Sequence, residues 1–177
     1  MKNTKKIVIA SLCASLGVIF LYLGVIISVM DMSAALLASF MVLFCVMELG
    51  YSYALAVYAI ISVLSLMLLP SPAPAWMFLL LFGYIPITKF AFEHFFKKMA
   101  WIPKIILFNL LYALTIFFGG KLLGFTAENQ FGIPETVIWI AFFVAGNVLY
   151  VVCDILYGRL TWLYIRKIRD RISKYLK

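Results

Sequence analysis

Four ionisable residues stand inside or at the edge of long apolar stretches, and they are the first candidates for chemistry. They are Glu48, Lys89, Glu93 and Asp154. A charge in hydrocarbon is unfavourable, so such residues usually face the protein interior and pair with one another. We expect Glu48, Lys89 and Asp154 to form an intramembrane charge network, through a Lys89–Asp154 or a Lys89–Glu48 pair. The alternative is that each side chain extends to the inner headgroups.

A second set of residues has the composition of a ligand site. A cavity for a small organic molecule needs aromatic and apolar walls with a few polar groups, here opening to the outside of the cell. Aromatic residues also gather at the membrane–water interface as a belt, which is the ordinary alternative. Asn109 and Asn147 lie near the middle of apolar stretches and should face inward, because an amide exposed to lipid is unfavourable. The candidate ligand-binding residues are Trp76, Phe78, Tyr84, Asn109, Tyr112, Trp139 and Asn147.

Sets of residues that would support catalysis or a metal site are absent from the sequence. There is one histidine, His94, and no Glu-x-x-His or His-x-x-x-His pair. No P-loop, dinucleotide fingerprint or Gly-x-Ser-x-Gly elbow occurs. Cys13, Cys45 and Cys153 are far apart in apolar surroundings and are expected to be packing residues. We therefore expect no enzyme activity, no metal and no cofactor.

The composition indicates the environment in which these residues must be positioned. Apolar residues make up 66% of the chain and charged residues only 12%, against about 45–50% and about 25% in soluble domains. A water-soluble fold of 177 residues could not hide that much apolar surface. We predict an all-α integral membrane bundle of six transmembrane helices. The expected spans are 7–30, two short spans within 34–69, then 75–95 with a kink at Pro86, 105–123 and 135–157.

The basic residues predict how this bundle is oriented. In the six-span layout all of the 15 Lys and Arg residues except Lys121 fall on the side of the N-terminus. Cytoplasmic loops carry such an excess, so both chain ends should be cytoplasmic, in a multi-pass protein of the plasma membrane. Because the basic residues cluster beside apolar runs, we expect no nucleic acid partner. At the split expected between 48 and 53, a re-entrant hairpin is the alternative to two full spans.

The C-terminal segment 158–177 differs from the transmembrane domain 1–157. Apolar residues recur there at helical spacing among Arg and Lys residues. This pattern predicts a basic amphipathic helix that lies on the inner leaflet or extends the sixth span. Its expected role is a membrane anchor, or else a docking surface for a cytoplasmic partner.

The first span carries a stripe of small residues, Ala10, Ala14 and Gly17, which would let another helix approach closely. The segment from Lys5 to Val18, KKIVIASLCASLGV, resembles the first helix of the substrate-binding (S) components of energy-coupling factor (ECF) transporters. Those proteins share the basic N-terminus, an Ala-x-x-x-Ala stripe on the first helix, six helices and about this length. The motif-level match is Ala10–Ala14, and the basic tail departs from the family pattern.

The resemblance implies a function as well as a fold. An S component binds a vitamin or other micronutrient outside the cell and docks, through its first-helix stripe, onto a transmembrane coupling protein that carries two ATPase subunits. Ala10 and Ala14 would be the docking residues, with Gly17 on the same stripe. The sequence leaves two other functions open. One is a self-contained permease or channel lined by Glu48, Lys89 and Asp154, and the other is a membrane-embedded lipid-modifying or assembly protein.

Overall fold

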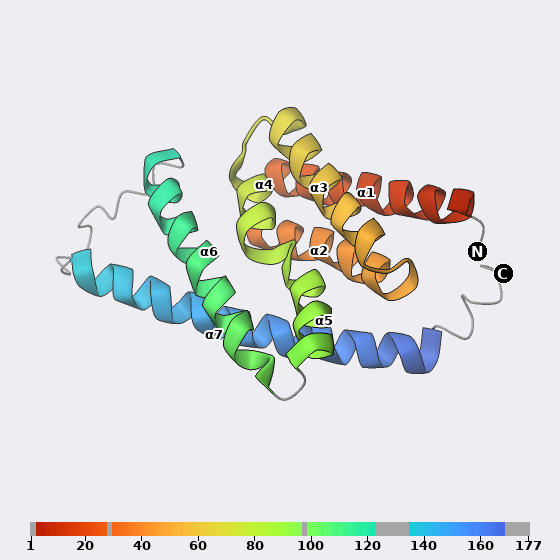
Figure 1. Ribbon diagram of the computed structural model, residues 1–177. Coiled ribbons are helices and arrows are strands. Elements are labelled where there is room, and N and C mark those ends of the chain that lie inside the picture. Colours follow the sequence, from red (N-terminus) through yellow and green to blue (C-terminus); the bar gives the residue numbers. More distant parts are fainter. Residues whose placement is uncertain (1–2, 28–29, 97–98, 123–134, 169–177) are drawn as a thin grey trace.

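The computed structural model describes residues 3–27, 30–96, 99–122 and 135–168 of the chain (Figure 1). Every regular element in these ranges is a helix, which confirms the all-α prediction. The elements are α1 (Asn3–Ile26), α2 (Asp31–Glu48), α3 (Tyr51–Leu68), α4 (Ala73–Met77), η1 (Phe78–Phe82), α5 (Ile85–Phe96), α6 (Trp101–Leu122), α7 (Glu135–Leu163) and η3 (Tyr164–Ile168).

Five helical stretches of the described chain are long and apolar enough to cross a membrane, as a multi-pass membrane protein requires. The remaining expected span, the fifth (105–123), corresponds to α6, whose described apolar stretch, Trp101–Ile116, is shorter than these five. Six crossings therefore remain a prediction. The five stretches are Asn3–Ile26, Asp31–Glu48, Tyr51–Leu68, Ala73–Glu93 and Val137–Lys167.

The break expected between 48 and 53 is a tight turn between two full helices. Helix α2 ends at Glu48 and α3 begins at Tyr51, and each has 18 residues, a length of about 27 Å. Gly50 has a φ of 92°, a conformation that residues with a Cβ rarely adopt. Its N–H and that of Leu49 both donate to the Cys45 carbonyl, at 3.1 and 2.9 Å. The glycine therefore makes the reversal between the two helices possible.

The fourth expected span is interrupted in the turn that precedes Pro86, the residue at which a kink is expected. The chain widens into the π-helical η1, turns at Gly83–Tyr84 and continues as α5, in which Pro86 is the second residue. The Gly83 N–H donates to the Phe78 carbonyl at 2.7 Å, while proline has no N–H to continue the ladder. The Tyr58 hydroxyl on α3 donates to the Leu79 carbonyl at 2.9 Å, so the wide turn is held by a neighbouring helix.

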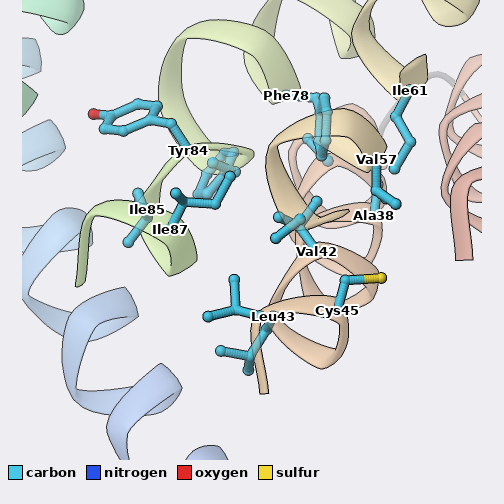
Figure 2. Close-up of a cluster of buried hydrophobic side chains, with 14 of the residues drawn as sticks. Ala38, Val42, Leu43, Cys45, Val57, Ile61, Phe78, Tyr84, Ile85 and Ile87 are labelled. Carbon is cyan, nitrogen blue, oxygen red and sulfur yellow. The ribbon is translucent and has the colours of Figure 1, made fainter. Parts of the chain in front are cut away.

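Helix α2 is central to the first part of the chain, because it packs against α1, α3, α4, η1 and α5. Its inward residues are mostly small, including Ala35 and Ala38, so its neighbours come close. Figure 2 shows part of the resulting core, in which Ala38 and Val42 of α2 lie with Val57 and Ile61 of α3. Close packing of small residues is the usual way in which helices associate in a membrane.

Contacts between the later helices set their relative directions. Lys104 of α6 contacts Asp154 of α7, and Tyr112 of α6 contacts Phe142 of α7. Residue numbers thus increase along α6 in the direction in which they decrease along α7. Helices α6 and α7 are therefore antiparallel.

Helix α7 runs parallel to α2 instead. Its Tyr157 ring packs against Phe40, and its continuation η3 places the Tyr164 ring against Phe44. The helix runs through position 158 without interruption and is followed directly by η3. The first part of the expected tail thus extends the last span, and residues 169–177 lie outside the described residues.

Candidate functional site: an apolar cavity beside a buried charge cluster

Four charged side chains from three helices meet in a charge cluster made of Lys89 and Glu93 on α5, Lys104 on α6 and Asp154 on α7. The Lys89 Nζ lies 3.0 Å from Asp154 Oδ1 and 3.5 Å from Glu93 Oε1. The Lys104 Nζ lies 2.7 Å from Glu93 Oε1 and 3.5 Å from Asp154 Oδ1. Each cation thus faces both anions, and the formal charges of the four residues cancel.

The cluster is shielded from its surroundings except on one side. Lys89, Lys104 and Asp154 are 7%, 4% and 7% exposed, whereas the Glu93 side chain is 47% exposed. Lys89 also donates to the Asp154 backbone carbonyl at 2.7 Å. A Cβ at Gly158 would lie 3.4 Å from the Lys89 Nζ, an ordinary contact distance, so the ammonium group lies directly against α7 at this position. Such burial is tolerable because each charge has an opposite partner.

The pairing expected from the sequence is made in part. The structure brings Lys89 and Asp154 together, one of the two pairs considered, and leaves Glu48 apart from them. Glu48 instead accepts a hydrogen bond from the Tyr164 hydroxyl at 3.0 Å. Lys104 precedes the expected span 105–123 and is not among the residues predicted for the network. Helix α6 begins at Trp101, so Lys104 belongs to its first turn.

A cavity of about 270 Å³ lies between η1, α5, α6 and α7, with one residue of α2 also in its wall, and we refer to it as the apolar cavity. Its walls are almost entirely aliphatic and aromatic. The lining residues are Met32, Leu81, Phe82, Ile85, Phe108, Tyr112, Phe142, Ala145, Gly146, Leu149, Tyr150 and Cys153.

An aromatic stack forms one wall of the apolar cavity. The Phe108 ring lies between the rings of Tyr150 and Tyr112, with centroid distances of 4.3 and 5.5 Å and interplanar angles of 23° and 14°. The Tyr112 hydroxyl donates to the Phe142 carbonyl at 2.7 Å. A Cβ at Gly146 would lie 2.4 Å from the Tyr112 ring, so only glycine lets this ring lie across α7. The wall is therefore fixed in place before any ligand arrives.

The apolar cavity adjoins the charge cluster. Cys153 lines the cavity, and the next residue of α7 is Asp154. Ile85 lines it from α5, one turn before Lys89. A molecule in the cavity would therefore rest against apolar walls with an ionic group just beyond one end.

Asn109 and Asn147 face each other between α6 and α7, as the inward expectation implied. Each side-chain amide donates to the other's oxygen at 3.1 Å. Each also donates to the carbonyl four residues earlier in its own helix at 3.0 Å. The two amides satisfy each other, and neither lines the apolar cavity.

Of the seven expected ligand residues, Tyr112 lines the apolar cavity and the other six do not. Phe78 is fully buried in the core and packs against Tyr58, and Trp76 and Trp139 are half-buried. Figure 2 shows Phe78 inside the core and the Tyr84 ring turned away from Val42 and Val57. Among the described residues, the buried Tyr84 hydroxyl has no hydrogen-bond partner.

The small-residue stripe of α1 faces the protein's own helices. Ala14 is 4% exposed, and Ala10 is half-buried against the core. A Cβ at Gly17 would lie 2.4 Å from the Ile61 side chain of α3. The stripe thus brings α1 close to α3, and the Ala14 and Gly17 positions are covered within the chain.

A repeat that the sequence analysis missed positions α7. Tyr150, Tyr157 and Tyr164 are seven residues apart, so they share one face of the helix. Their rings contact Phe108, Phe40 and Phe44, and Tyr157 shares a hydrogen bond with Ser39. The seven-residue spacing of tyrosines in an apolar run was the signal that would have found this face.

Comparison with known proteins assigns no relative to the chain: no family model, no curated protein and no solved structure matches it. The function must therefore be argued from the cavity and the charge cluster themselves.

Proposed function

We propose that the chain is a membrane-embedded binding subunit that captures a small, largely apolar organic molecule for ATP-driven uptake, in the manner of an ECF S component. The observation that carries the proposal is the apolar cavity, about 270 Å³ in volume and walled by residues of five helical segments. Ligand sites in proteins are typically concave, mostly apolar and largely pre-formed. The ATPases that drive the uptake would be separate chains, since the sequence has no nucleotide motif.

The cavity defines what kind of molecule would fit. Its volume lies just below the roughly 300–1,000 Å³ of drug-sized pockets, so the ligand is vitamin-sized or smaller. The Tyr150–Phe108–Tyr112 wall offers flat rings for stacking, and an aromatic or unsaturated ligand would gain most from it. The cavity suits a ligand with few hydrogen-bonding groups, because its lining is almost entirely apolar and the Tyr112 hydroxyl is already engaged.

The orientation in the membrane is part of the proposal. Six crossings with both ends in the cytoplasm of a plasma-membrane protein agree with the antiparallel course of α6 and α7 and the parallel course of α2 and α7. In this arrangement the charge cluster lies toward the cytoplasmic ends of α5 and α7, and the cavity lies farther out. A ligand taken from outside would therefore stop at the cluster.

Docking onto a coupling protein would require α1 to expose its small-residue stripe. Ala14 and Gly17 are covered by the chain's own helices, so they would meet a partner only after α1 moved away from α3. Ala10 is half-buried and nearer the start of α1. Copurification with a coupling protein and two ATPase subunits is the direct test of the partner.

The binding proposal is tested by mass spectrometry of small molecules that remain with the gently purified chain. Leu149→Trp places an indole into the cavity wall and should remove the bound molecule. Val148→Trp is the matched control, because Val148 is the neighbouring residue, is 58% exposed and does not line the cavity. Equal retention of the molecule by both variants would refute the cavity as the binding site.

A self-contained permease is the second candidate, favoured by the charge cluster at the end of the cavity. Charged pairs inside membrane helices commonly mark a transport path. Purified chain in liposomes under a proton or ion gradient separates the two functions. Transport by the chain alone that stops in Asp154→Asn would establish the permease, whereas binding without transport supports the capture subunit.

A further inference from the structure

Glu48 is a carboxylate that neither the cavity nor the charge cluster uses. The chain carries a formal charge of +8, yet in the described residues no Lys or Arg lies within ion-pair distance of Glu48. Its Oε1 accepts the Tyr164 hydroxyl at 3.0 Å. A neutral hydroxyl leaves the negative charge in place, so this half-buried carboxylate lacks a counter-ion in that part of the chain.

A second, smaller cavity of about 200 Å³ is lined in part by Glu48, and we call it the Glu48 pocket. The Tyr164 ring in its wall is held edge-on by Phe44, with a centroid distance of 5.7 Å and an interplanar angle of 89°. The pocket thus has a fixed aromatic wall next to an anion. Its lining residues are Val46, Met47, Glu48, Phe90, Tyr164 and Ile165.

This combination selects one class of ligand. An anion would be repelled by Glu48, and a purely apolar group would desolvate the carboxylate without compensation. A metal ion would need several ligands, and the described residues contain no group of three His, Cys, Asp or Glu side chains that could hold one. A carboxylate with aromatic rings suits an organic ammonium, which gains from both the charge and the ring faces.

We propose that the Glu48 pocket binds an organic ammonium group at this end of the molecule. Its volume is below that of drug-sized sites, which suits a group of headgroup size. The α2–α3 turn, the start of α1 and the end of α7 lie on the same side in Figure 1. Lys6 lies 5.8 Å from the Tyr53 ring there, and the exposed Arg166 and Lys167 follow the pocket in the chain.

The ammonium group can come from two sources with the same chemistry. A phospholipid such as phosphatidylethanolamine carries it at the headgroup level, with a phosphate that basic residues attract. A soluble amine carries it in the aqueous phase. The inference does not rest on the proposed uptake function, since the Glu48 pocket shares no lining residue with the apolar cavity.

The experiment uses the purified full chain with two kinds of probe. Native mass spectrometry compares retention of phosphatidylethanolamine with that of phosphatidylglycerol from an equimolar mixture. Saturation-transfer NMR measures binding of tetramethylammonium and ethanolamine to the chain in phosphatidylglycerol nanodiscs. Preferential retention of phosphatidylethanolamine identifies the lipid source, and saturable binding of a soluble amine identifies the other.

Three variants test whether Glu48 is responsible. Glu48→Gln should weaken the binding about tenfold or more, because the neutral amide keeps the shape and removes the charge. Met47→Lys supplies a tethered ammonium beside the intact carboxylate and should block the probe even if Glu48→Gln folds poorly. Asp31→Asn removes the same charge at the opposite end of α2 and should bind as the wild type does.

Two results would overturn the inference. One is a wild-type chain that shows neither a preference for phosphatidylethanolamine nor saturable binding of either amine. The other is unchanged binding in both Glu48→Gln and Met47→Lys. The Tyr164–Glu48 hydrogen bond would then serve only to fasten the end of α7 to α2.

Discussion

The Lys89 ammonium group lies 3.0 Å from the Asp154 carboxylate and 2.7 Å from the Asp154 backbone carbonyl. A single lysine of α5 thus engages both the side chain and the backbone of one residue of α7. Lys104 approaches the same carboxylate from α6, so Asp154 is the point at which three helices are joined. This junction adjoins the apolar cavity, and its loss should affect both stability and binding.

Removing one member of this pair should be far more costly than removing both. Lys89→Met leaves a buried carboxylate with the more distant Lys104, and we expect a loss of about 3 kcal/mol of unfolding free energy. Lys89→Met with Asp154→Leu keeps the Lys104–Glu93 pair at 2.7 Å and should recover most of the loss. Denaturant unfolding in detergent, followed by circular dichroism, measures both. The pair would not be energetically coupled if the two single losses simply added.

The amide pair between α6 and α7 should contribute modestly. Asn109→Leu removes two hydrogen bonds to Asn147, and interhelical hydrogen bonds in membranes average about 0.6 kcal/mol with a maximum near 1.7 kcal/mol. The double variant Asn109→Leu with Asn147→Leu should cost little more than the single one, since no amide is left without a partner. The same unfolding measurement applies, and a double loss well above either single loss would contradict the pairing.

The small-residue stripe of α1 should prove to be a packing element. Gly17→Leu drives a side chain into Ile61, and overpacking of this kind costs about 1–3 kcal/mol. Ile61→Ala in the same chain should restore part of that loss by making room. Ser15→Leu is the matched control, because Ser15 is exposed two residues earlier on α1, and it should leave the melting temperature unchanged. A harmless Gly17→Leu would mean that α1 does not pack on α3.

Cysteine labelling in cells tests the membrane orientation. In a chain with Cys13, Cys45 and Cys153 changed to Ala, we expect Ser71→Cys to react with an impermeant maleimide in intact cells. Lys6→Cys and Arg166→Cys should react only after the membrane is opened, because six crossings put both on the cytoplasmic side. Labelling of Arg166→Cys in intact cells would indicate an odd number of crossings.

The sequence by itself determined the class of the protein. Long apolar runs separated by short polar breaks predict helices in lipid, because a backbone without water must satisfy its hydrogen bonds locally. The turn after Glu48 followed from its polar residues and Gly50. The inward direction of Asn109 and Asn147 followed from the unfavourable exposure of an amide to lipid. Each of these depends on local composition, which the sequence contains directly.

The site depended on which residues of distant helices meet, and that is set by packing. Lys89 had two possible partners, Glu48 and Asp154, and only the position of α7 against α5 decided between them. Lys104 belongs to the charge cluster because α6 begins at Trp101, so that Lys104 lies in its first turn and is buried. Phe78 was expected at a ligand and Ala14 at a partner, but both lie in the core. The sequence does not reveal this, because all faces of an apolar helix have a similar composition. The tertiary structure determines which face of each helix is buried. Close packing depends on the shapes of the side chains, whereas hydrophobicity is similar on all faces of these helices.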